Sequence, residues 1–85
     1  MPDDLEDGSD AYIRKDYKTA FEKWKPLAEQ GNPWLQLMIG TMYHAGAGVT
    51  QDYREAAKWL RLSAEQGEAS AQHFLGKLFL DGAGV

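Results

Sequence analysis

The stretch that decides the fold is residues 52–85, DYREAAKWLRLSAEQGEASAQHFLGKLFLDGAGV, because residues 16–49 repeat it. The earlier stretch reads DYKTAFEKWKPLAEQGNPWLQLMIGTMYHAGAGV, and the two align at an offset of 36 residues without a gap. Of the 34 aligned pairs, 13 are identical. A fixed period of this length is typical of solenoids, in which each unit is one supersecondary element that buries its apolar face against its neighbours.

Each unit has the pattern of a helical hairpin. Apolar residues recur at helical spacing through 17–28 and again through 35–43, and no segment alternates as a strand does. Asp16 and Asp52 stand where a helix N-cap is expected, and Asn32 followed by Pro33 starts the second helix of the first unit. The sequence therefore predicts an all-α fold of two hairpin repeats with four main helices.

Two glycines lie inside the predicted second helices at the same register. Gly40 and Gly76 each cost about 0.8–1.0 kcal/mol relative to alanine in a helix interior. A cost repeated at one register needs a structural gain, and we expect close approach of the paired helix at both positions.

The net charge of −4 is unevenly distributed along the chain of 85 residues. Residues 1–10 hold five acids and no base, and the other 75 residues hold nine bases and eight acids. We expect residues 1–10 to be a disordered acidic tail, residues 11–51 to be a lead-in followed by the first repeat, and residues 52–85 to be the second repeat. The nearly neutral body has no basic footprint for nucleic acid.

The repeated motifs carry a resemblance to a known family. Asp-Tyr-x-x-Ala, Ala-Glu-Gln-Gly, Gln-x-x-x-Gly and Gly-x-Gly-Val follow each other in the same order in both units. This series resembles the Sel-one-like repeat family, a relative of the tetratricopeptide repeat. The resemblance implies a right-handed α/α superhelix and a role as a scaffold or adaptor that binds other proteins. Some secreted members carry a disulfide in each repeat, and this chain contains no cysteine.

Features that could indicate chemistry have simpler structural readings. Gly46 and Gly48 follow a predicted helix and precede no Lys-Ser/Thr pair, unlike the glycines of a phosphate-binding loop. His44 and His73 fall at different positions of the repeat and form no metal-binding helix motif. No run of residues has the length and apolarity of a membrane span. We therefore expect a non-enzymatic protein with no catalytic residues, no cofactor and no metal.

A protein or peptide partner is the expected ligand. The bases concentrate on the first helix of each unit, and first helices line the concave face in solenoids that this chain resembles. Trp34 stands where the second unit has Ser70, and it is either a binding anchor or a cover over the bend. The predicted partner-binding residues are Lys18, Lys25, Trp34, Arg54, Lys58 and Arg61.

The last predicted helix has no following helix to cover its far side. In the first unit, the following helix provides that cover. We therefore expect apolar surface at the C-terminal edge, where the chain forms homodimers or joins a longer array. The residues of this predicted edge are Phe74, Leu75, Leu78 and Phe79.

The sequence thus leaves two functions open. The first is an adaptor module that binds a partner on the solenoid surface. The alternative is a purely structural fragment or subunit that stacks through its exposed edge. The tail has neither the basic nor the apolar region of a signal peptide, so a cytoplasmic location is expected, or a periplasmic or secreted one if a signal has been removed.

Overall fold

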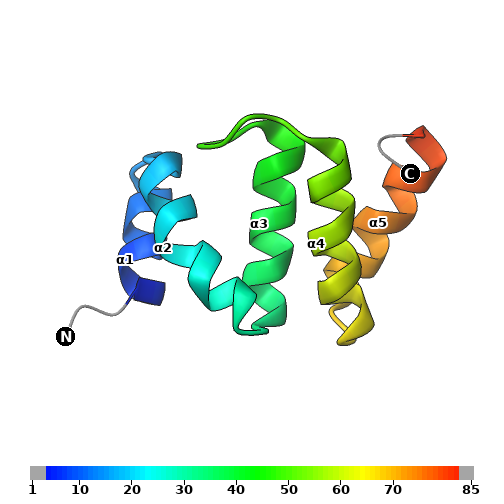
Figure 1. The fold of residues 1–85 in the computed structure, drawn as a ribbon, viewed down its shortest axis with the longest axis horizontal. Helices are drawn as coiled ribbons and strands as arrows, with labels where there is room; N and C mark the ends of the chain where they lie inside the picture. The colour runs from blue at the N-terminus through cyan, green and yellow to red at the C-terminus, as the bar shows by residue number, and fades with distance from the viewer. Residues whose placement is uncertain (1–3, 83–85) are drawn as a thin grey trace.

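The computed structural model describes residues 4–82, and all regular structure in this part of the chain is helical. Five helices follow one another in a row (Figure 1). Their bounds are α1, Asp4–Ile13; α2, Tyr17–Glu29; α3, Pro33–Ala45; α4, Tyr53–Glu65; and α5, Ala69–Asp81. The all-α repeat fold predicted from the sequence is confirmed, with one more helix than expected.

The additional helix is α1, and it corrects the prediction of a disordered tail over residues 1–10. Residues 1–3 lie outside the described part, but residues 4–10 are helical. Ala11 is fully buried, and the indole Nε1 of Trp24 donates a hydrogen bond of 3.2 Å to the Leu5 carbonyl. Acids near a helix N-terminus interact favourably with the helix dipole, so the charge that indicated disorder is compatible with a docked helix.

The expected N-caps are present. The Asp16 side chain accepts a hydrogen bond from the Thr19 N–H, and Asn32 accepts one from the Leu35 N–H at 3.1 Å. Asp52 accepts two, at 3.0 and 3.1 Å, from the second and third residues of α4. Each carboxylate or amide satisfies backbone donors that have no partner inside the helix.

The loop after α3 depends on glycine. Gly46 ends α3 with φ of 70°, in the left-handed region, and Gly48 has φ of 74°. A Cβ on Gly48 would collide with the Tyr17 backbone carbonyl at the start of α2. The Gly-Ala-Gly loop therefore rests directly on the N-terminus of the neighbouring helix, and a side chain at position 48 would push it away.

Packing runs from each helix to the next one in the chain. Extensive contacts within the described residues join α1 to α2, α2 to α3, α3 to α4, and α4 to α5. The resulting body measures 41 × 24 × 17 Å. One core cluster lies mainly among α1, α2 and α3 and includes Trp24, Leu35 and Ile39, and a second joins α3, α4 and α5 through Leu60 and Leu78.

The expectation for the two helical glycines is half correct. A Cβ on Gly40 would lie 2.8 Å from Leu60 Cγ and 3.2 Å from the Ala56 carbonyl oxygen, so close approach is confirmed there. The approaching helix is α4, which follows, and not the paired helix α2. At Gly76 the expectation is wrong, because nothing lies within 4 Å of the position that a Cβ would occupy.

Candidate functional site

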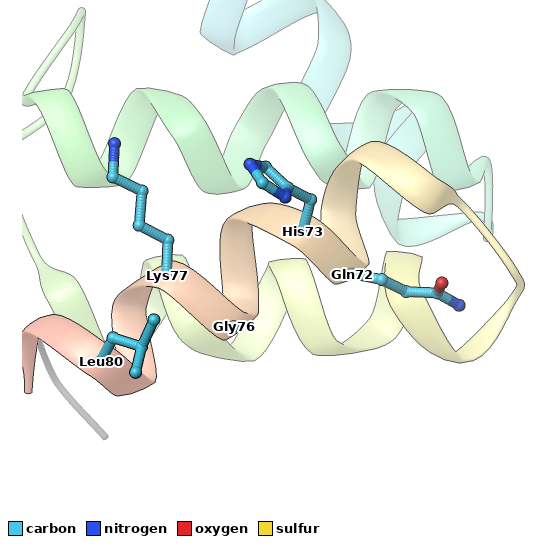
Figure 2. A pocket seen from close by; sticks show the side chains of 5 residues that line it. All are labelled: Gln72, His73, Gly76, Lys77 and Leu80. Atoms are coloured by element: carbon cyan, nitrogen blue, oxygen red, sulfur yellow. The ribbon is translucent and has the colours of Figure 1, made fainter.

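The outer face of α5 carries the exposed apolar side chain of Leu80 beside polar side chains. A shallow pocket of about 380 Å³ lies along it, and Figure 2 shows its lining side chains on one stretch of this helix. The lining residues are Gln72, His73, Gly76, Lys77 and Leu80. They recur at helical spacing on the side of α5 that no described helix covers, since only α4 packs extensively against it.

The sequence placed an exposed apolar edge on this helix, and the structure changes its membership. Phe79 is 56% exposed, in line with the expectation, whereas Leu78 is only 2% exposed. Leu78 points into the second core cluster, so its inclusion in the edge was wrong. Phe74 and Leu75 are partly buried against the same cluster.

The most exposed apolar side chain of the edge was missed. Leu80 is 89% exposed, and it lines the pocket near Gly76. Its repeat equivalent is His44, which is partly buried, with its ring 5.2 Å from that of Tyr53. The appearance of leucine at a position where the first unit has histidine is a sequence signal that could have identified it.

The predicted basic residues divide into two groups. Lys18 and Lys25 lie on α2, while Arg54, Lys58 and Arg61 lie on α4 and are exposed. Because α3 lies between α2 and α4 (Figure 1), the structure does not bring these groups into one cluster.

Two of these bases rest near aromatic rings of their own helix. Lys25 Nζ lies 5.6 Å from the centroid of the Phe21 ring, and Lys58 Nζ lies 6.0 Å from that of Trp59. The remaining predicted bases keep their charges on the exposed surface. The arrangement is suited to electrostatic contact with acidic segments.

Trp34 lies at the second position of α3 and is 52% exposed. It belongs to neither core cluster of the described residues. About half of its surface is therefore available to a partner, and its role as a binding anchor or as a cover over the bend stays a prediction.

A second pocket, of about 300 Å³, lies between α1, the start of α2 and the end of α3. Tyr12 and Tyr17 line it with an edge-to-face contact at 5.2 Å, together with Thr41, Met42, Ala45 and Ala47. Sequence reasoning missed this pocket, because it depends on Tyr12 and therefore on α1, which was not expected.

The titratable side chains of the described residues show few features of chemical interest. Between residues 4 and 82, no three His, Cys, Asp or Glu side chains are grouped to hold a metal. The ring of His44 packs edge-to-face on Phe74 at 5.2 Å. Among titratable groups, hydrogen bonds from Thr19 hold the pKa of Asp16 below its usual value of 3.8, as a helix cap should.

No helix within residues 4–82 is both long enough and apolar enough to cross a membrane.

The surface of the described helices carries exposed aromatic, aliphatic and basic side chains, an arrangement suited to binding.

Comparison with known proteins gives one result. The family model of the Sel1 repeat matches residues 5–32, 35–68 and 69–85. No curated protein matches the chain. The three matched segments correspond to α1 with α2, α3 with α4, and α5.

This division is offset by one helix from the repeats predicted above. The units of the family begin at α1, α3 and α5, so α2 and α4 are second helices in that frame. The predicted basic residues therefore lie on second helices of the family's units, and their role in binding a partner stays a prediction. The unit that begins at α1 does not align with the next one without a gap, because Gly8 precedes Tyr17 by nine residues, whereas Gly40 precedes Tyr53 by thirteen.

Proposed function

The chain belongs to the Sel1 repeat family, whose repeats are in general protein-interaction modules, and on that basis we propose that it is a non-enzymatic adaptor that binds a protein partner. The observation that carries this proposal is the open face of α5. Leu80, which is 89% exposed, borders the pocket on this face, and its chain neighbour Phe79 is 56% exposed. Exposed apolar patches bordered by polar side chains mark interaction sites.

A second binding surface is proposed from the sequence-predicted residues. Trp34 supplies an exposed aromatic anchor, and Lys58 and Arg61 supply positive charge on α4. Aromatic residues and arginine are enriched among the residues that dominate binding energy at interfaces. Two surfaces on one rigid row of helices would allow an adaptor to hold two partners, or two segments of one partner.

The open face of α5 also supports a second candidate function, that of a structural piece which stacks on further copies. Phe79 and Leu80 would then be buried between copies. The two candidates differ in what contacts α5 in solution.

Site-specific cross-linking tests the adaptor role. A photo-reactive benzoylphenylalanine replaces Leu80 in one variant, Trp34 in a second and Asp10 in a control, and each is irradiated in the native lysate. Asp10 is exposed on α1, a helix that carries none of the candidate binding or edge residues. We expect a distinct protein to be trapped from position 80 or 34 and not from 10. Cross-links to the chain itself alone would favour the structural piece, and their complete absence would overturn both.

A further inference from the structure

Three glycines occupy matching places on α1, α3 and α5, and two of them receive a large side chain from the next helix. A Cβ on Gly8 would collide with the Trp24 indole, and one on Gly40 would crowd Leu60. Trp24 and Leu60 are themselves repeat equivalents, 36 residues apart. Gly76 is the third glycine, and the space above it is empty. We call the space left by the missing side chain of each glycine a notch. The notches at Gly8 and Gly40 are filled by a large side chain of the next helix, and the notch at Gly76 is open.

A polar contact accompanies the filled notch between α3 and α4. Gln36 Nε2 donates to the Ala28 carbonyl at 3.1 Å, which holds the side chain in place. Its Oε1 then accepts a hydrogen bond of 2.8 Å from Gln66 Nε2, which also donates to the Gly31 carbonyl at 2.9 Å. One glutamine amide at the end of α4 is therefore bound by two acceptors on the preceding hairpin.

Equivalent acceptors are present at α5 and the bend before it. Gln72 Nε2 donates to the Ala64 carbonyl at 3.0 Å, in the manner of Gln36. Gln72 Oε1 and the Gly67 carbonyl, equivalents of the two acceptors that bind Gln66, accept no hydrogen bond from residues 4–82. The face of α5 thus offers an apolar notch and a pair of unused acceptors with the geometry already used once.

These contacts define what a complementary helix must carry. On α4 the elements are Ala56, which allows the backbones to approach, Leu60 four residues later, and Gln66 six residues after that. The same spacing of small, large and amide residues recurs on α2. Lys77 stands on α5 where α3 has Thr41, so a carboxylate on the incoming helix would gain a charged neighbour.

We propose that the outer face of α5 docks an amphipathic helix of a partner protein that has this spacing: a small residue, a large apolar residue four positions later and a glutamine six positions after that. The inference rests on the proposed function and names the class of partner. A folded second copy is a poorer occupant, because its own helices with this pattern are committed internally. Trp24 is 3% exposed and Leu60 is fully buried.

A peptide with the sequence of residues 52–68 of this chain, labelled with a fluorophore, is the probe. It contains the required spacing, and its binding to the full chain is followed by fluorescence anisotropy. We expect saturable binding that weakens by about tenfold or more when Gly76→Leu fills the notch. Gly76 faces open space, so this variant keeps its fold and its Tm does not fall.

Matched peptides resolve the individual contacts. A peptide with Leu60→Ala, or one with Gln66→Ala, should bind about tenfold more weakly. A peptide with Arg54→Ala should bind like the parent, because Arg54 lies on the exposed side of α4.

Absence of saturable binding would overturn the inference. Binding of equal affinity to the Gly76→Leu variant would also overturn the inference. The peptide would then be displacing α4 from its position against α3 and not binding to α5. Sedimentation that reveals a dimer abolished by Gly76→Leu, without peptide binding, would assign the face to a second copy. The peptide assay requires no natural partner and cross-linking requires no partner sequence, so the two proposals fail separately.

Discussion

Gly40 on α3 lies so close to Leu60 on α4 that a Cβ at Gly40 would sit 2.8 Å from Leu60 Cγ. The absence of a side chain at position 40 is what lets these two helices approach. The equivalent position on the last helix, Gly76, has no such neighbour. Two glycines that are indistinguishable in the repeat therefore have opposite roles in stability.

The two glycines should respond oppositely to substitution. Gly40→Leu overpacks the contact with Leu60 and should lower the free energy of unfolding by about 1–3 kcal/mol or more. Gly76→Ala replaces an exposed glycine by a better helix former and should raise the free energy of unfolding by up to about 1 kcal/mol. Urea denaturation followed by circular dichroism measures both, and equal losses in the two variants would contradict the open notch at Gly76.

The two buried tryptophans should differ in their tolerance of phenylalanine. Trp24 Nε1 donates to the Leu5 carbonyl, whereas the buried Trp59 Nε1 has no hydrogen-bond partner among residues 4–82. Trp24→Phe loses this hydrogen bond, whereas Trp59→Phe removes a donor that has no partner among the described residues. Trp24→Phe should therefore lower the free energy of unfolding by about 1–3 kcal/mol more than Trp59→Phe does. Chemical denaturation of the two variants provides the comparison, and an equal cost would argue against the hydrogen bond to Leu5.

Removal of α1 should destabilise the remaining helices. Deletion of residues 1–13 exposes Trp24 and the fully buried Ala20, and each kcal/mol lost should lower the Tm by about 4–8 °C. The fluorescence of Trp24 should also shift to longer wavelength. Deletion of residues 1–3 alone serves as the control. An unchanged Tm after the longer deletion would restore the view that this segment contributes nothing to the fold.

Acid should weaken the cap of α2. Because the pKa of Asp16 is lowered in the folded chain, its stabilising contribution is complete above the unfolded value of 3.8 and is lost as the pH falls through the lower folded value. Asp16→Asn keeps a good cap but cannot titrate. Denaturation midpoints of the two proteins, measured from pH ~6 to ~2, should therefore converge at the acid end. A constant difference between them across this range would mean that Asp16 does not titrate with folding.

The basic surface of α4 is tested by charge reversal. Lys58→Glu with Arg61→Glu should weaken binding of the cross-linked partner and change the free energy of unfolding by less than about 0.5 kcal/mol, because both side chains are exposed. Titration calorimetry at low salt measures the affinity, and a thermal melt serves as the stability control. Unchanged affinity would leave the face of α5 as the binding surface.

The sequence by itself determined the local structure of this protein. The 36-residue offset, the N-caps at Asp16, Asn32 and Asp52, and the glycine that ends α3 are properties of neighbouring residues, which interact over one or two helical turns. The helices from α2 onward could therefore be predicted with their order. The exposure of Phe79 on the last described helix agrees with the expectation from the sequence.

Only the tertiary structure decided which repeated residues are equivalent in environment. The acidic residues 4–13 become a helix because Ala11 and Gly8 pack on α2, a contact that crosses a loop shorter than the one between α3 and α4. Leu78 is buried and Leu80 is exposed, although both are leucines of one helix, because burial depends on which side α4 covers.

Gly40 and Gly76 share a register in the repeat. A following helix packs against Gly40 and none of the described helices packs against Gly76, which gives the two glycines different roles.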